Sequence, residues 1–153
     1  MNGRVHQVAV SDGGVPKLAV AGGYVGPTGL LGDRHNEPSH GGPNKALCLF
    51  ALEVIEAVAA EGHSLFPGAV GENVTLAGVD WSLVKPGSRW RIGDEVEIEI
   101  TSYTIPCKTN ARWFLGGDFS RINQQLHPSS SRVYARIVTE GVIRPGDQFL
   151  PAI

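Results

Sequence analysis

Short apolar and β-branched runs, interrupted by glycine and proline, constrain the fold of this chain most strongly. The stretch 95–101, E-V-E-I-E-I-T, alternates strictly, with Val96, Ile98 and Ile100 on one face and glutamates on the other. This period-two pattern is typical of a strand with one wet face. Further strands are predicted at 4–10, 46–50, 72–78 and 132–139, and the P-G-D turn at 145–147 leads into a last one.

One segment has a clear helical pattern. Between Leu52 and Glu61 the apolar residues Val54, Ile55 and Val58 recur at helical spacing, and Gly62 supplies a C-terminal stop. A second, weaker helix is predicted over 119–126. The chain also holds 20 glycines and 10 prolines, which suit frequent turns. Many short strands and few helices predict a mainly β fold, a closed or nearly closed β-barrel with one or two short helices.

The bulk properties predict a single domain over residues 1–153. A composition of 42% hydrophobic and 18% charged residues is ordinary for a globular protein. Thirteen basic and fifteen acidic side chains, with no run of like charge, give no electrostatic footprint for nucleic acid or an anionic membrane. The N-terminus lacks a signal-peptide pattern, and no apolar stretch approaches the roughly 20 residues that span a bilayer. We therefore expect a cytoplasmic protein.

The segment 29–46, G-L-L-G-D-R-H-N-E-P-S-H-G-G-P-N-K-A, predicts a loop that binds an anion. Glycine and proline make both helix and strand unfavourable, and long loops in compact domains are usually functional or disordered. A Gly-Gly pair lets the backbone N–H groups approach a ligand, and basic side chains supply charge for an oxyanion. The candidate residues are Asp33, Arg34, His40, Gly41, Gly42 and Lys45. The spacing matches neither a P-loop nor a dinucleotide fingerprint.

Cys107 is the candidate reactive residue. It follows the alternating strand directly, in Y-T-I-P-C-K-T-N, where Pro106 ends the strand and Lys108 offers a cation that favours the thiolate. A thiolate ligates metals or attacks electrophiles; the alternative is a buried structural cysteine. A zinc site with His35 and His40, or a nucleophile–base pair with His40, are further alternatives. Cys48 lies in an apolar run and is expected to be structural.

A row of polar residues on the 132–139 strand forms a second candidate feature. Arg132, Tyr134 and Arg136 share one face of the strand because side chains alternate along it. This row suits a pocket for a planar, multiply anionic ligand, or else a solvated barrel exterior balanced by the glutamates of 95–101. Further candidate ligand residues are Glu72 and Asn73 at a strand start and Arg112 after the cysteine.

Taken together, these segments resemble the MOSC family, the domain at the C-terminus of molybdenum cofactor sulfurases that also occurs as free-standing bacterial proteins. The resemblance rests on eight motifs in the family's order. They are G-V-P-K (14–17), G-L-L-G-D-R-H (29–35), H-G-G-P-N-K-A (40–46), F-P-G-A-V-G-E-N (66–73), I-G-D (92–94), P-C-K (106–108), S-R-V-Y-A-R (131–136) and G-V-I-R-P-G-D (141–147). The family fold is a β-barrel of the pyruvate-kinase-barrel type.

The resemblance implies a molybdenum cofactor (molybdopterin) held by the loop and the basic residues, Lys17 of the first motif included. It makes Cys107 the family's cysteine, which either ligates molybdenum or carries sulfur as a persulfide. The implied function is the reduction of small N-hydroxylated compounds. The alternative is a non-enzymatic carrier of the cofactor or of persulfide sulfur. The sequence has no flavin or iron–sulfur motif, so the electron or sulfur donor is expected to be another protein.

Overall fold

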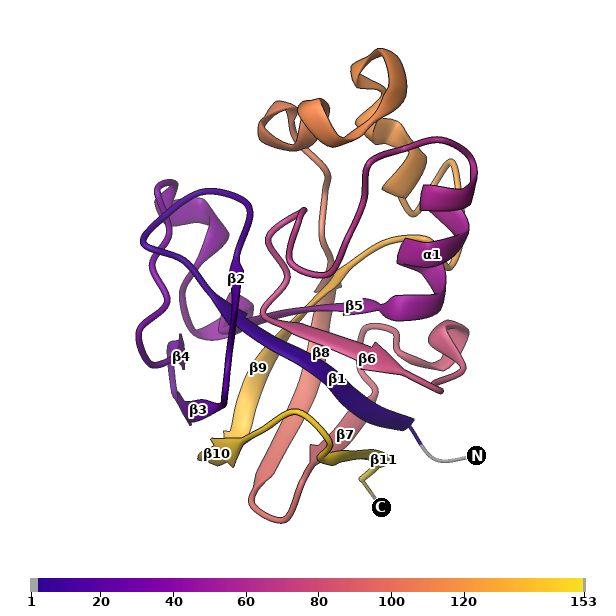
Figure 1. Ribbon diagram of the computed structural model, residues 1–153. Helices are drawn as coiled ribbons and strands as arrows, with labels where there is room; N and C mark the ends of the chain where they lie inside the picture. The colour runs from indigo at the N-terminus through magenta and orange to yellow at the C-terminus, as the bar shows by residue number, and fades with distance from the viewer. Residues whose placement is uncertain (1–2, 153) are drawn as a thin grey trace.

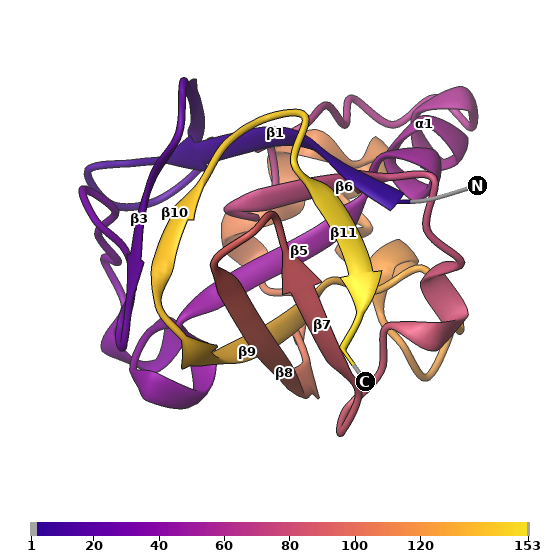
Figure 2. The ribbon, with the colours of Figure 1, turned by 90° about the horizontal axis from the view of Figure 1, so that it is seen from below.

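A closed barrel of seven strands forms the body of the molecule in a computed structural model that describes residues 3–152. The order around the barrel is β1-β11-β7-β8-β9-β5-β6, and β6 pairs with β1 to close the ring. Figure 2 looks into this ring. Only the β5–β6 pair is parallel. The strands are β1 (Gly3–Val10), β5 (Leu47–Ala51), β6 (Val74–Ala77), β7 (Arg89–Ile92), β8 (Val96–Tyr103), β9 (Val133–Thr139) and β11 (Gln148–Pro151).

Smaller elements surround the barrel. Strand β2 (Leu18–Val20) pairs with β1, and a separate sheet joins β10 (Gly141–Ile143), β3 (Gly23–Gly26) and β4 (Gly29–Leu30). The single α-helix among the described residues, α1 (Leu52–Ala60), covers one side (Figure 1). The 3-10 helices are η1 (Pro38–His40), η2 (Pro43–Lys45), η3 (Trp81–Leu83), η4 (Lys108–Trp113), η5 (Leu115–Gly117) and η6 (Phe119–Ile122).

Along each strand of the barrel, every second side chain points inward, and these side chains fill the barrel interior. On β8 the side chains of Val96, Ile98 and Ile100 are buried, whereas the intervening glutamates are partly exposed. Full burial of such an aliphatic side chain contributes about 1.5–3 kcal/mol. Trp90 of β7 stacks on Phe149 of β11, with ring centroids 4.8 Å apart, where these two strands pair. The barrel interior is therefore a packed core, and a ligand site has to lie on its outside.

The predicted barrel fold is confirmed, as are the strands at 4–10, 46–50, 72–78, 95–101 and 132–139 to within two residues at most ends. The predicted helix at 52–61 is α1, and Gly62 follows it in a left-handed conformation at φ 108°. The predicted helix over 119–126 is wrong: the structure has only the 3-10 helix η6 there, followed by turns. Within the described chain, no helix has the length and apolar character needed to cross a bilayer.

Candidate functional site

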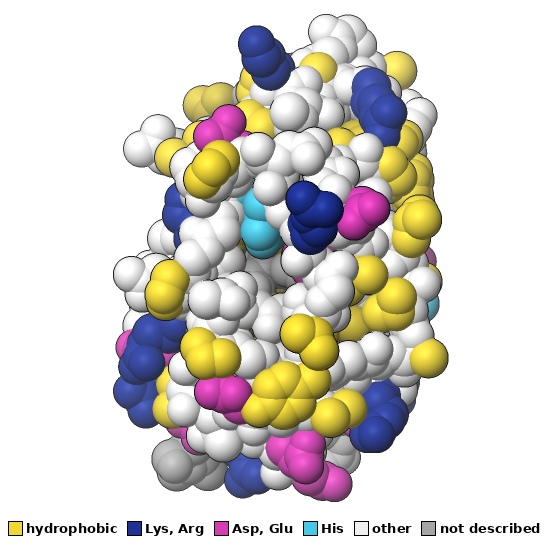
Figure 3. All heavy atoms as spheres, turned by 90° about the vertical axis from the view of Figure 1, so that its left-hand side faces the viewer, with side chains coloured by type: hydrophobic (Ala, Val, Ile, Leu, Met, Phe, Trp, Pro, Cys, Tyr) yellow, Lys and Arg dark blue, Asp and Glu magenta, His cyan; other side chains and the backbone are white. Residues whose placement is uncertain are grey.

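A pocket lies on the outer wall of the barrel, roofed by the 29–46 loop. Its floor comes from β5 and β9, and its remaining walls come from the segments 14–17, 70–73 and 104–110. In Figure 1 the loop lies to the left of the barrel and the excursion that follows β8 rises above it. The face drawn in Figure 3 is hollowed, with a histidine side chain at the hollow and lysine or arginine side chains around it.

Eight of the predicted site residues line this pocket although they come from distant parts of the chain. They are Lys17, Arg34, His40, Lys45, Asn73, Cys107, Arg132 and Tyr134. Arg132 and Tyr134 reach the pocket because β9 directs alternate side chains away from the core, where Val133 and Ala135 lie. The predicted polar row therefore contributes two of its three members to the same pocket as the cysteine.

Cys107 presents a partly exposed thiol to the pocket. It has an extended backbone and occupies the N-cap position of η4, so its carbonyl accepts the N–H of Asn110 at 3.0 Å. Its Sγ lies 2.8 Å from the hydroxyl oxygen of Thr109. Lys108, which the sequence suggested as the activating cation, is exposed and does not line the pocket. The sulfur is thus accessible and has a hydroxyl neighbour.

Arg132 places a buried positive charge with unpaired hydrogen-bond donors in the site. Its side chain is 5% exposed, and Nη1 donates to the carbonyl of Val70 at 2.7 Å. Its Nε and Nη2 atoms are buried and have no hydrogen-bond partner among the described residues. A buried charged donor without an acceptor is costly, and native structures normally satisfy such groups. Two donors of Arg132 are therefore free to bind an anion in the pocket.

Asn110 complements this arginine with an acceptor. It is 2% exposed and lines the same pocket, and its Oδ1 is buried without a partner in the part of the chain that the structure describes. An amide of this kind serves a ligand that offers N–H or O–H donors. The pocket therefore provides unpaired donors and an unpaired acceptor together, which suits a ligand with both an anionic and a heterocyclic part.

Tyr134 and Lys45 form one side of the pocket. The Lys45 ammonium lies 5.1 Å from the centroid of the Tyr134 ring, and it donates to the carbonyl of Ser39 at 2.8 Å. This pair ties the roof loop to β9. Burial raises the pKa of Tyr134 to about 12, with the nearby thiols adding to the effect. The phenol therefore keeps its proton at neutral pH and remains a hydrogen-bond donor.

Two histidines of the roof loop, His35 and His40, also line the pocket. Partial burial lowers the pKa of both, and Lys17 adds to the effect at His35. At His40 the carboxylate of Glu37 opposes this change, while Arg132 reinforces it. Both rings are therefore mainly neutral at pH 7, and each can donate through one nitrogen and accept through the other.

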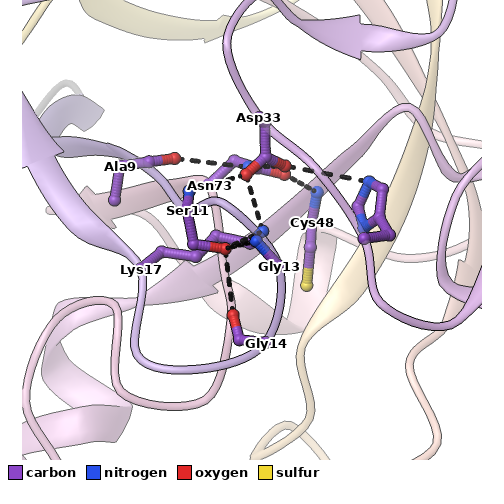
Figure 4. A network of polar contacts seen from close by, with 9 residues as sticks. Ala9, Ser11, Gly13, Gly14, Lys17, Asp33, Cys48 and Asn73 are labelled. Atoms are coloured by element: carbon purple, nitrogen blue, oxygen red, sulfur yellow. Dashed lines mark hydrogen bonds and ion pairs between the residues drawn. The ribbon is translucent and has the colours of Figure 1, made fainter.

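A buried network holds the roof loop on the barrel (Figure 4). The Lys17 ammonium pairs with Asp33 at 2.7 Å, and both side chains are at most 5% exposed. Asp33 also accepts the backbone N–H of Ser11 at 2.9 Å and the amide of Asn73 at 2.9 Å. Asn73 in turn accepts the N–H of Cys48 on β5 and donates to the carbonyl of Ala9 on β1. Three elements thus converge on one amide side chain.

The structure places the other predicted residues outside the pocket lining. Asp33 is occupied by Lys17, and the N–H of Gly41 donates to the carbonyl of Pro38. Gly42 has a φ of 100° and serves the turn between η1 and η2. Neither glycine lines the pocket as the structure describes it, and their contact with a ligand stays a prediction.

The remaining three predicted ligand residues do not line the pocket. Glu72 is fully buried beneath the pocket. Arg112 donates to the carbonyl of Val15 at 2.7 Å and lies over the ring of Trp113. Arg136 pairs with Glu99 on the barrel exterior, as the alternative interpretation of the strand predicted. Of these three, Arg112 links the segment after Cys107 to the pocket wall at Val15.

Several lining residues were not identified from the sequence. They include Val15, Val70, Thr104, Ile105, Thr109 and Asn110. Thr109 and Asn110 follow the predicted cysteine directly, and the 3-10 helix that turns them toward the pocket has no clear sequence signal. Cys48 is buried as expected, but it also contributes to the pocket wall and lies 3.8 Å from the hydroxyl of Thr104. No group of three metal-ligating side chains occurs within residues 3–152, which removes the support for a zinc site.

Comparison with known proteins places the chain in a family. The model of the MOSC domain matches residues 36–149. An uncharacterized protein YflK of Bacillus subtilis (strain 168) is 29% identical over 109 residues, which cover 71% of this chain and 48% of that protein. A protein of Gibberella moniliformis named "Reductase" is 30% identical over 95 residues, 59% of this chain and 17% of its own length. The chain thus spans about half, or less, of these relatives.

Solved structures support the fold. The crystal structure of YiiM from Geobacillus stearothermophilus matches with a TM-score of 0.75 at 23% identity, covering 99% of this chain and 75% of that one. YiiM from Escherichia coli matches with a TM-score of 0.74 at 22% identity, over 100% and 70% of the two chains. These likenesses concern the fold, whereas the family match covers most of the sequence. The chain therefore belongs to the MOSC domain family, which binds the molybdenum cofactor in general.

Proposed function

We propose that this protein binds the molybdenum cofactor in the pocket beside Cys107 and reduces small N-hydroxylated compounds with electrons from a partner protein. The cysteine sulfur is the ligand to the metal. The family membership supports the cofactor, and the relative named "Reductase" supports the reaction class. Carriage of the cofactor or of persulfide sulfur, without turnover, is the alternative function.

The buried guanidinium of Arg132 is the observation that carries this proposal. Two of its N–H donors have no partner within the described chain, and they lie in the pocket that Cys107 also lines. Planar guanidinium groups bind phosphate through paired, charge-assisted hydrogen bonds. The cofactor carries a phosphate, so it offers the anion that this arginine lacks. Arg34 and Lys45 add positive charge at the rim and roof.

The other side chains fit the remaining parts of the same group. The unpaired Oδ1 of Asn110 suits an N–H donor of a pterin ring. A thiolate is a soft ligand and suits a metal that is already held by sulfur. These features agree with the donor and acceptor chemistry of a molybdopterin, and the fold brings Cys107 and Asn110 together with the distant Arg132 to provide them.

The chain's own residues prepare the site in distinct ways. When bound, the cofactor supplies two-electron redox chemistry. Cys107 would hold the metal, and Arg132, whose Nη1 is anchored to the carbonyl of Val70, would hold the phosphate. Tyr134 keeps its proton, since its pKa is raised to about 12, and so offers a stable O–H donor. The roof loop, held by the Lys17–Asp33 pair, limits access of water.

Turnover with matched arginine variants tests the proposal. Protein from a host that makes the cofactor is supplied with a small N-hydroxylated base and an artificial reductant. We expect turnover by the unaltered protein, none by Cys107→Ser, and at least a tenfold loss for Arg132→Lys, because lysine cannot reproduce the planar pair of donors. Arg136→Lys is the control and should stay within twofold. Molybdenum-loaded protein that passes its cofactor to an acceptor but never turns over would favour the carrier function instead.

A further inference from the structure

We infer that the pocket, without any cofactor, is a selective site for oxyanions that carry a proton, and that it prefers inorganic phosphate to sulfate. This inference goes beyond the proposed function, because it needs neither the metal nor the redox reaction. It rests on two buried side chains that line the pocket, Arg132 and Asn110, whose polar atoms include some without a partner within residues 3–152.

Arg132 attracts an anion into the pocket. It is 5% exposed, and its Nε and Nη2 atoms are unpaired donors within the described chain. Its Nη1 is bound to the carbonyl of Val70 at 2.7 Å, so the guanidinium is held in place before a ligand arrives. Such fixed, charged donors suit the oxygens of a tetrahedral oxyanion. Phosphate and sulfate both meet this requirement, so Arg132 alone does not distinguish them.

Asn110 supplies the discrimination between the two ions. It is 2% exposed, and its Oδ1 is a buried acceptor without a partner in the part of the chain that the structure describes. Inorganic phosphate near neutral pH keeps at least one O–H group that can donate to this oxygen, whereas sulfate has none. A ligand that leaves a buried acceptor unsatisfied binds more weakly, and sites built around such a group reject analogues that lack the donor.

The other charged and titratable groups make pH 6 a suitable condition for a test. Burial raises the pKa of Glu72 to about 7 although Arg132 opposes this change, so at pH 6 the carboxyl group is mainly uncharged and does not repel an anion. Phosphate is then mainly singly charged and sulfate doubly charged, so charge alone favours sulfate. His35 and His40 also line the pocket and are the alternative acceptors for a phosphate proton.

Calorimetric titration with the two ions tests the inference on protein purified from a host that does not make the cofactor. At pH 6 and constant ionic strength we expect phosphate to bind about fivefold more tightly than sulfate, or better, because sulfate leaves the buried acceptor unsatisfied. Asn110→Leu removes the acceptor and keeps a similar side-chain volume, so the ratio of the two affinities should fall to one or below. Arg132→Met should bind neither ion.

Asn36→Leu is the matched control. Asn36 also lines the pocket but is exposed, so water satisfies its amide whichever ion binds, and the affinity ratio should stay within twofold of the unaltered protein. Circular dichroism checks the fold of each variant, and Asn110→Ala replaces Asn110→Leu if the leucine variant does not fold.

Two results would overturn the inference. One is equal or tighter binding of sulfate by the unaltered protein, and the other is a phosphate preference that persists when the Asn110 amide is removed, which would place the acceptor elsewhere. Molybdenum retention is measured on separate protein from a host that makes the cofactor. A protein that retains molybdenum but shows no phosphate preference would keep the proposed function and lose this inference, so the two failures are distinguishable.

Discussion

At the scale of single residues, two arginines four positions apart, one just before β9 and one within it, have different surroundings. Arg132 is buried in the pocket with unpaired donors, whereas Arg136 pairs with Glu99 on the barrel exterior. The difference arises because Arg132 is held against the carbonyl of Val70 in the pocket wall, while Arg136 lies beside a carboxylate of the neighbouring strand β8. The pair therefore offers a matched test of the anion site.

Phosphate should stabilise the protein through Arg132 and not through Arg136. A ligand that binds only the native state raises its stability by mass action, by about 2.7 kcal/mol at 100 times the dissociation constant. We expect phosphate to raise the melting temperature beyond an ionic-strength control with sodium chloride. Arg132→Met should lose this increase, and Arg136→Met should keep it. A thermal-shift titration that gives the same response in both variants would contradict the anion site.

The buried carboxyl group of Glu72 leads to a separate prediction, which concerns how protein stability depends on pH. Burial raises the pKa of this fully buried carboxyl group from 4.5 to about 7. Between these two values the native state binds more protons than the unfolded state, so this group lowers the free energy of unfolding as pH rises. Its full effect is about 3 kcal/mol, at 1.36 kcal/mol per pKa unit. The stability added by Glu72→Gln should therefore grow from pH 4.5 to pH 7.

Chemical unfolding of both proteins at several pH values measures this difference. The comparison with Glu72→Gln is needed because other carboxylates act in the opposite direction: Glu61, for example, has its pKa lowered by Arg121. A stability difference between the two proteins that stays constant from pH 4.5 to pH 7 would show that Glu72 titrates normally.

At the scale of elements, the junction of β1, β5 and the roof loop decides whether a pocket exists. The buried Lys17–Asp33 pair and the amide of Asn73 hold the loop on the barrel. Removal of one member of a buried ion pair leaves an uncompensated charge and typically costs about 3–5 kcal/mol. We therefore expect Lys17→Met to destabilise the protein by an amount in this range.

A double variant shows whether this loss comes from the unpaired charge. Lys17→Met combined with Asp33→Leu removes both charges, so it should be more stable than Lys17→Met alone. Urea unfolding measures the stability of the unaltered protein, of Lys17→Met, of Asp33→Leu and of the double variant. If the double variant loses at least as much stability as the two single variants combined, the pair is not the main source of the stabilisation.

The elements of the barrel were largely predictable because period-two burial marks them directly. The strict alternation at 95–101 is β8, and the helical spacing after Leu52 is α1. The missed strands β2, β3, β4 and β10 have at most four residues and lie outside the closed ring, where burial imposes little pattern. Strand β7 was missed as well, although it belongs to the ring, because its four residues are too few for a clear alternation. The helix predicted over 119–126 was wrong for a related reason. The apolar residues of this segment pack in a 3-10 helix and turns.

The sequence indicated which residues belong to the candidate site better than it indicated where their side chains and N–H groups point. Cys107, Arg132 and Tyr134 were identified because polar groups at a strand end or on one strand face are unusual. The Gly-Gly pair does not line the pocket, because the N–H of Gly41 and the carbonyl of Gly42 serve the turns η1 and η2, which depend on local backbone geometry. Asn110 was missed, since its role depends on how η4 turns after the cysteine.

At the scale of the whole molecule, a closed barrel carries its pocket on the outer wall. The packed interior leaves no room for a large ligand, so the roof loop and the excursion after β8 build the site from outside (Figure 1). This arrangement leaves the thiol of Cys107 partly exposed at the pocket. The family match extends from residue 36 to residue 149, so it covers the barrel strands from β5 to β9 and most of the pocket lining, while β1 lies before it.

Molybdenum content tests the central claim most directly. The protein is purified from a host that makes the cofactor, beside a known molybdenum enzyme as a control for supply, and metal is measured per folded chain. We predict about one molybdenum per chain, and close to none in Cys107→Ser at the same folded fraction, because the thiolate is the only ligand that the chain is proposed to provide. A well-folded protein that holds no molybdenum, while the control enzyme is loaded, would contradict the claim that this pocket binds the cofactor.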